Sequence, residues 1–171
     1  VLAPVRDCRF SREAEMEYAP AHGIPVQATH ASPYSIDDNI WGRSIECGIL
    51  EDPWNEPPYD AYALTCEPEE APDHPEHVEI QFENGIPVAI DGVHMDGPTL
   101  VARLNEQAGR HGVGRIDMVE DRLVGFKSRE VYECPAAITL INAHRALGTL
   151  TLDKKTLAAK KELEAKFGEL T

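Results

Sequence analysis

The chain has 171 residues, of which 42% are hydrophobic, and its 16 basic and 30 acidic residues give a formal net charge of −14. This length favours one domain, or one domain with part of another, and the apolar content supports a folded core. Nucleic acid and anionic membrane surfaces are disfavoured as partners because they would meet a like charge. No apolar run reaches the roughly 20 residues of a membrane-spanning helix.

The first 26 residues predict one short strand followed by one helix. The apolar run Val1–Val5 suits the end of a buried strand. Ser11 is a favoured N-cap, and acids follow it in the first turn of a helix that should end near Ala19, before Pro20. Charged residues in this segment argue against a signal peptide, and a first residue that is not Met suggests a chain that begins inside something larger.

The middle of the chain predicts a polar turn region, a long loop and a hairpin. Residues 51–77 hold six of the 13 prolines, which predicts a loop with at most a short strand at 59–65. Residues 78–90 alternate in hydrophobicity around Asn84-Gly85, which predicts a β-hairpin. Residues 30–50 begin with turn-forming residues, and their expected buried side consists of Ile40, Trp41, Ile45, Ile49 and Leu50.

The last third predicts helices and two strands. A helix should start at Asp96-Gly97-Pro98 and end at Gly112. Strands are expected at 115–119 and 123–127, with Glu120-Asp121 at the turn between them. Two further helices should follow, one from Pro135 to Leu147, ended by Gly148, and one that Asp153 caps. The predicted fold class is α+β, with a mixed or antiparallel sheet, a hairpin at about 78–90, packed helices and a C-terminal extension helix.

Metal, disulfide and nucleotide motifs are weak or absent in the sequence. The four cysteines form no CxxC pair and are too dispersed for a disulfide scaffold, so we expect free thiols in a reducing cytoplasm. His74 and His77 lie near two glutamates and could bind a divalent metal, although a solvated acidic loop is the commoner explanation. The sequence contains no GxxxxGK[ST], GxGxxG or GxSxG motif.

Two segments place polar groups where packing alone does not require them. They are Ser32–Trp54 and His111–Ala136, and each sets hydroxyls, carboxylates and a basic residue between apolar anchors. A zwitterionic amino-acid ligand needs such a mixture, because a carboxylate meets its ammonium group while hydroxyls or cations meet its carboxylate. Spacing leaves open whether the two segments meet in space.

These segments also carry a family resemblance. Over nearly all its length the chain resembles the C-terminal part of the argininosuccinate synthase family. The motifs are VLAPVRD at 1–7, HGIPV at 22–26, SPYSIDDNIWGRSIECGILEDP at 32–53 and HGVGRIDMVEDRLVGFKSREVYECPA at 111–136. The resemblance implies a cytoplasmic, homotetrameric ligase of arginine biosynthesis and the urea cycle. It joins citrulline and aspartate with ATP and Mg, and it releases AMP and pyrophosphate.

The resemblance also implies a division of labour along the chain. Residues 1–27 would end the nucleotide-binding domain, residues 28–152 would form the citrulline-binding synthetase domain, and residues 153–171 would form a truncated oligomerisation helix. ATP and most aspartate contacts belong to an N-terminal domain that this sequence lacks, so we expect the chain to be inactive alone. The alternative is a non-catalytic binding or assembly module of the same fold.

Four citrulline-binding residues follow from the matching motifs. Glu120 would bind the α-ammonium group, while Ser35, Ser44 and Tyr132 would hydrogen-bond the polar head. Without the resemblance, each has a commoner explanation: a turn or cap, a solvent-facing serine, a hairpin-turn acid and an interface aromatic residue. None of the four is expected to act as a nucleophile or metal ligand.

Some residues of these motifs have no role that the resemblance assigns. They are Arg115, Lys127, Ser128 and Arg129. Cys47 stands where a small residue such as Gly or Ala is expected; it should fit there, and as a buried thiol it need not be reactive.

Overall fold

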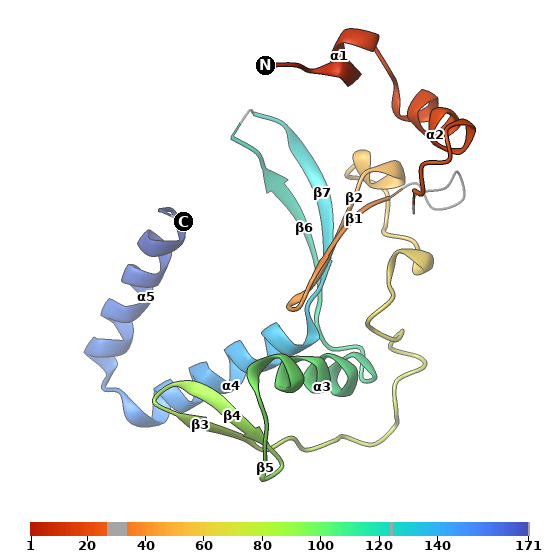
Figure 1. Ribbon diagram of the computed structural model, residues 1–171. Coiled ribbons are helices and arrows are strands. Elements are labelled where there is room, and N and C mark those ends of the chain that lie inside the picture. Colours follow the sequence, from red (N-terminus) through yellow and green to blue (C-terminus); the bar gives the residue numbers. More distant parts are fainter. Residues whose placement is uncertain (27–33, 124, 171) are drawn as a thin grey trace. The chain divides into compact units, whose positions relative to one another are not determined.

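A computed structural model describes residues 1–26, 34–123 and 125–170 of the chain (Figure 1). Helices and strands alternate irregularly along the chain, and the strands form two antiparallel sheets. This architecture confirms the predicted α+β class. The chain divides into two compact units. Unit 1 contains residues 1–37, 44–61 and 117–131, and unit 2 contains residues 38–43, 62–116 and 132–171.

The N-terminal part of unit 1 is helical. The predicted strand at Val1–Val5 is wrong, because helix α1 spans Pro4–Cys8 with proline in its first turn, where a missing N–H costs nothing. Helix α2 spans Arg12–Ala21, and Ser11 caps it as predicted by accepting a hydrogen bond from the Ala14 N–H at 3.3 Å. The helix extends past its expected end near Ala19 and includes Pro20 in its last turn.

A four-stranded sheet contains all four predicted site residues. Its strands are β1 (Ser35–Asn39), β2 (Gly42–Glu46), β6 (Arg115–Asp121) and β7 (Lys127–Glu133), and their order is β1-β2-β7-β6. The predicted boundaries of the last two were wrong. Glu120 and Asp121 belong to β6, and the connection is at 122–126, where the Arg122 N–H donates to the Phe126 carbonyl at 3.0 Å.

The β1–β2 hairpin stands where a turn or loop is expected early in residues 30–50, of which residues 30–33 lie outside the described residues. Trp41 donates its backbone N–H to Asn39 Oδ1 at 2.8 Å, which stabilises the turn. Gly42 follows at φ 151°, and a Cβ atom there would lie 2.0 Å from the carbonyl oxygen of Glu133. Ile40 and Trp41 are exposed in this tight turn, and Ile49 is exposed as well. Of the five residues expected to be buried, only Ile45 and Leu50 are buried.

Unit 2 contains the hairpin that the sequence predicts most clearly. Strands β3 (Ile80–Glu83) and β4 (Ile86–Ile90) pair antiparallel, and Asn84 and Gly85 between them have φ 51° and 81°. Strand β5 (Val93–His94) pairs with β4 on its other side. The prediction is therefore confirmed.

Helices α3 and α4 complete the core of unit 2. Helix α3 spans Gly97–Gly109 and begins as predicted, with Asp96 accepting from the Thr99 N–H at 2.8 Å. It ends three residues earlier than expected. Helix α4 spans Pro135–Thr151 and packs beside α3 (Figure 1). The buried core cluster comprises Ile90, Leu100, Val101, Leu104, Ala136 and Leu140.

The C-terminal helices differ from the prediction at one boundary. Gly148 does not end α4, because the helix continues through it, and a Cβ atom there would only reach ordinary contact with Leu157. Helix α5 spans Lys154–Gly168 and begins as expected, with Asp153 accepting the N–H groups of two following residues. Among residues 1–26, 34–123 and 125–170, no helix combines the length and hydropathy required to cross a membrane.

The long proline-rich loop has no strand at 59–65. One 3₁₀ turn, Gly48–Glu51, leads into the loop, and another, Tyr59–Ala61, lies within it. In unit 2, the buried carboxylate of Glu133 accepts three successive backbone N–H groups, those of residues 63, 64 and 65, at 2.8–2.9 Å. It also accepts the Thr65 hydroxyl at 2.7 Å and the Arg43 guanidinium at 2.8 Å. At residues 63–65 the backbone N–H groups of the loop are thus satisfied by one side chain instead of a strand ladder.

Candidate functional site

Three of the four predicted site residues lie in unit 1. Ser35 opens β1, Ser44 lies in the middle of β2 and Glu120 lies near the end of β6. Tyr132 lies in the part of β7 that belongs to unit 2. All four side chains are partly buried, which suits residues that must both be held in place and remain accessible.

A cluster of three glutamates surrounds one arginine in unit 1. Arg122 donates from Nη2 to Glu46 Oε2 at 2.6 Å and to Glu130 Oε1 at 2.7 Å. Its Nε lies 3.4 Å from Glu120 Oε2 and donates to Ser128 Oγ at 2.9 Å. We call Glu46, Glu120 and Glu130 the glutamate cluster. It comes from three strands that are consecutive in the sheet, β2, β7 and β6.

The charges of the cluster are unbalanced. A hydrogen bond with Glu130 and repulsion from it are the main causes that raise the pKa of Glu120 above its ordinary value; Arg122 opposes them. Hydrogen bonds to Glu130 and Glu46 raise the pKa of the Arg122 guanidinium. Three carboxylates therefore face one cation, and full ionisation leaves an excess of two negative charges. A small cationic group, such as an ammonium, would relieve this excess.

No pattern in the sequence identifies Glu46, Glu130 or Arg122 as members of the candidate site. Only the contact between Ser128 and Glu130 could have been expected, because strand residues two positions apart share a face. Glu46 is 76 residues from Arg122, and no local pattern relates the two.

A second arginine in unit 1 has a structural role. Arg129 donates from Nε and Nη2 to the two oxygens of Asp117, at 2.8 and 2.5 Å. Its hydrogen bonds are the main cause that lowers the pKa of Asp117. Nη1 donates to the carbonyl oxygens of Pro53 and Asn55, so Arg129 fixes the start of the long loop on the sheet.

Arg115, in unit 2, is also fully used by the protein itself. Its guanidinium donates to the Thr65 hydroxyl at 2.7 Å and carbonyl at 2.9 Å, and to Glu67 Oε1 at 2.7 Å. It also lies over the Tyr62 ring, 3.7 Å from the centroid. Arg115 therefore holds the loop and is not available to a phosphate group.

The glycines of HGVGR do not form a phosphate-binding loop. A Cβ atom on Gly114 would lie 2.5 Å from the backbone of Pro135, and one on Gly112 would lie 3.1 Å from the Cys66 carbonyl oxygen. These glycines permit close packing against the protein's own backbone. The triphosphate of ATP does not fit the described residues of this motif, so we derive no step through ATP from them.

The histidine pair does not gather a set of metal ligands. His74 and His77 are exposed, and residues 1–26, 34–123 and 125–170 contain no group of three or more His, Cys, Asp or Glu side chains that could hold a metal ion. Glu76 between them accepts from Gln107, Arg110 and His111 instead, at 2.6–2.9 Å. These hydrogen bonds, that of Gln107 first, lower the pKa of Glu76 to about 2.

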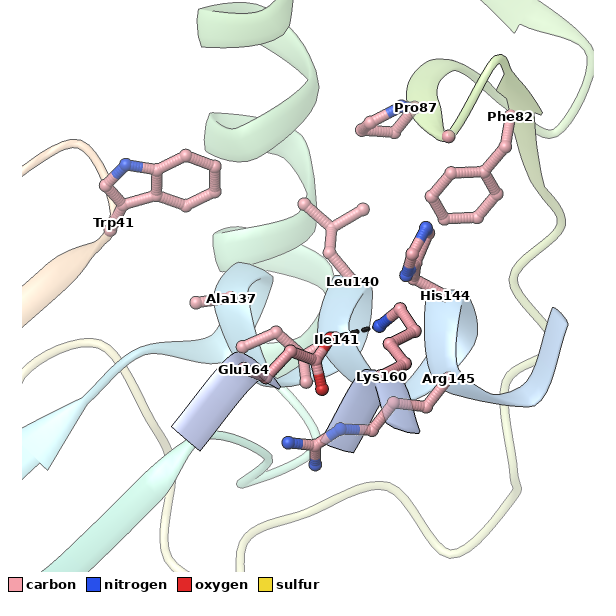
Figure 2. A pocket seen from close by; sticks show the side chains of 11 residues that line it. Trp41, Phe82, Pro87, Ala137, Leu140, Ile141, His144, Arg145, Lys160 and Glu164 are labelled. Atoms are coloured by element: carbon pink, nitrogen blue, oxygen red, sulfur yellow. Dashed lines mark hydrogen bonds and ion pairs between the residues drawn. The ribbon is translucent and has the colours of Figure 1, made fainter. Parts of the chain in front are cut away.

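Unit 2 contains a largely apolar cavity of about 600 Å³ (Figure 2). The Phe82 and His144 rings lie 5.7 Å apart at its wall, and Lys160 pairs with Glu164 on α5. None of the four predicted site residues lines it. The lining residues are Trp41, Phe82, Gly85, Pro87, Ala137, Leu140, Ile141, His144, Arg145, Lys160 and Glu164.

Unit 1 of this α+β protein carries a carboxylate-rich cluster around one arginine, and its charge suits a cationic group better than a nucleotide. A family model described as the arginosuccinate synthase C-terminal domain matches residues 34–171. The chain belongs to the argininosuccinate synthase family and corresponds to its C-terminal part.

Named relatives match along the whole chain. It is 58% identical over 171 residues to argininosuccinate synthase of Rubrobacter xylanophilus, and this match covers 100% of this chain and 42% of the relative. It is 58% identical over 170 residues to argininosuccinate synthase of Bacillus subtilis and 55% identical over 170 residues to that of Streptococcus gordonii; each match covers 99% of this chain and 42% or 43% of the relative. The chain thus spans less than half the length of these relatives.

Proposed function

We propose that this chain is the citrulline-binding part of a ligase that joins citrulline and aspartate into argininosuccinate, with release of AMP and pyrophosphate from ATP. The observation that carries the proposal is 58% identity, along the whole chain, to proteins named argininosuccinate synthase. ATP, Mg and most aspartate contacts would come from residues outside this sequence, as the misfit of the HGVGR glycines to a phosphate supports.

Each of the four site residues has a proposed contact with citrulline. Glu120 binds the α-ammonium group, and the excess negative charge of the glutamate cluster supports this role. The hydroxyls of Ser35, Ser44 and Tyr132 hydrogen-bond the polar groups of the ligand and fix its pose. In this proposal their task is alignment, because the residues outside the chain deliver the other reactants.

Alignment is a sufficient task in this reaction. ATP bound by residues outside this sequence would transfer its adenylyl group to the ureido oxygen of citrulline, with release of pyrophosphate, and so would make that oxygen part of a leaving group. Glu120 and the three hydroxyls hold the citrulline carbon where the aspartate amine can attack, which makes the step effectively unimolecular.

The proposed enzyme is a cytoplasmic homotetramer of arginine biosynthesis. Its four cysteines are free, which suits a reducing compartment. Residues 153–171 are the proposed oligomerisation helix. Exposed apolar side chains on and just after α5 support this role; they are Leu163, Phe167 and Leu170. Residues 28–152 are the proposed synthetase domain, and residues 1–27 are the proposed end of the nucleotide-binding domain.

A reconstitution assay tests the proposal. The chain is mixed with the N-terminal portion of an argininosuccinate synthase, and argininosuccinate is measured with citrulline, aspartate, ATP and Mg present. We expect no product from the chain alone and measurable product from the mixture. Glu120→Gln should abolish most of that product, whereas Glu69→Gln, the same change on an exposed loop residue, should not. Self-association without any restored ligation would favour the assembly-module alternative.

A further inference from the structure

Arg122 is placed to control the shape of the glutamate cluster. It lies in the turn after β6 and contacts all three carboxylates, at 2.6, 2.7 and 3.4 Å. The carboxylates differ in exposure: 42% of the Glu120 side chain is exposed, against 33% for Glu46 and 8% for Glu130. A ligand from solvent would therefore reach Glu120 most easily, while Glu130 is held in the sheet.

The cluster needs its guanidinium in order to keep this arrangement. Glu120 and Glu130 are close enough to share a hydrogen bond, and two ionised carboxylates at that separation repel each other. The planar guanidinium offers donors in fixed directions, so it neutralises the repulsion and also sets where each oxygen lies. Ser128 Oγ accepts from Nε and holds the guanidinium plane itself.

We propose that Arg122 is a positioning residue for the ammonium subsite: it holds Glu120 and Glu130 side by side, so that the α-ammonium of an amino-acid substrate meets two carboxylates instead of one. The inference rests on the proposed function, which makes Glu120 the ammonium partner. It adds Glu130 as the second carboxylate and gives Arg122 an indirect role, since the guanidinium would repel an ammonium and acts only through the carboxylates.

This arrangement links binding to pH. The groups that face Glu120 are Glu130 on β7, Glu46 on β2 and Arg122, and their balance raises the Glu120 pKa. A proton on the Glu120–Glu130 pair occupies the place of the ammonium. Citrulline binding should therefore weaken as the pH falls through the raised pKa, with proton release on binding in that range. Removal of the guanidinium leaves more repulsion in the pair, so the midpoint of this pH profile should move upwards.

The test is calorimetric titration with L-citrulline between about pH 5 and 7, where the ligand's own ammonium stays charged. Where this chain is part of a longer protein, the titration uses that full-length protein. The variants are Arg122→Gln and Arg122→Lys. Lys127→Gln is the matched control, because it removes one positive charge from the same hairpin, where Lys127 is exposed and pairs with exposed Asp121.

We expect Arg122→Gln to bind citrulline about tenfold or more weakly near pH 7. The loss of citrulline affinity relative to the wild type should become smaller as the pH rises. The midpoint of the pH profile of binding should lie at a higher pH than in the wild type. Arg122→Lys keeps the positive charge but loses the planar, forked set of donors, so its affinity for citrulline should lie between those of the wild type and Arg122→Gln. It serves as the test if Arg122→Gln fails to fold. Lys127→Gln should match the wild type.

Two results would overturn the inference: unchanged binding by both Arg122 variants, or a deficit that is the same at every pH, as a general loss of structure would produce. A wild-type protein that binds no citrulline at any pH would instead overturn the proposed function.

Discussion

The buried carboxylate of Glu133 is the strongest local constraint on the long loop, and Glu133→Gln changes it with almost no change in shape. In the wild type, Oε1 accepts from the N–H groups of Leu64 and Thr65 and from the Thr65 hydroxyl. Oε2 accepts from Arg43 and from the Ala63 N–H. An amide NH₂ in place of either oxygen would therefore face at least two donors.

The expected loss follows from those donors. A buried donor without an acceptor costs about 1–3 kcal/mol, so two of them cost about 2–6 kcal/mol, and we expect a loss of about 4 kcal/mol in the free energy of unfolding. That is a large part of the roughly 5–15 kcal/mol typical of a domain. Urea denaturation measures it as a lower midpoint at similar slope. Amide hydrogen exchange at residues 63–65 should also accelerate.

A control and a pH series make the result decisive. Glu69→Gln makes the same chemical change on an exposed residue of the loop and should alter the stability by less than about 0.5 kcal/mol. Burial alone would raise the Glu133 pKa, but the hydrogen bonds outweigh it and lower the pKa. The stability from Glu133 is thus present above its unfolded pKa and is lost as the pH falls through its lower folded pKa. A loss below about 1 kcal/mol for Glu133→Gln would refute this reasoning.

Three further changes test the fold. Gly42→Ala should cost about 2 kcal/mol or more, since its Cβ would lie 2.0 Å from a carbonyl oxygen of β7; Gly92→Ala, at φ 75° with open space, should cost only about 1 kcal/mol, and equal losses would contradict the close approach. Asp96→Ala removes an N-cap and should lower the unfolding free energy by about 1 kcal/mol in thermal or urea denaturation; no loss would contradict the cap. Gln107→Ala should raise the pKa of Glu76 from about 2 towards its ordinary value of 4.5 in a ¹³C NMR titration, so that stability falls less steeply in acid; an unmoved pKa would exclude the Gln107 hydrogen bond as its main cause.

Local patterns predicted the elements that local forces stabilise. The hairpin at β3–β4 follows from alternation around Asn84-Gly85, and the starts of α2, α3 and α5 follow from capping side chains. The predicted element boundaries are wrong where contacts between residues distant in the sequence determine the structure. The sequence pattern places the connection between β6 and β7 too early, because Leu123 and Phe126 resemble strand residues although both are exposed in the turn.

The same distinction applies to the candidate site. Ser35, Ser44, Glu120 and Tyr132 came from motifs that resemble a family, since no spacing rule relates residues from separate strands. The glutamate cluster could not be predicted, because Arg122 reaches Glu46 only after β2 and β7 pair. Charge counts in the sequence show an acidic chain, but only the paired sheet shows which carboxylates share a cation.

The tie between Glu133 and the loop also bears on the order of folding. Its backbone hydrogen bonds join residues that are 68 to 70 positions apart, so they close a large loop and depend on β7 being formed first. The proline-rich segment should therefore become ordered late, after the rate-limiting step. In that case Glu133→Gln would leave the refolding rate nearly unchanged and would accelerate unfolding, which makes the carboxylate a determinant of how long the native state persists.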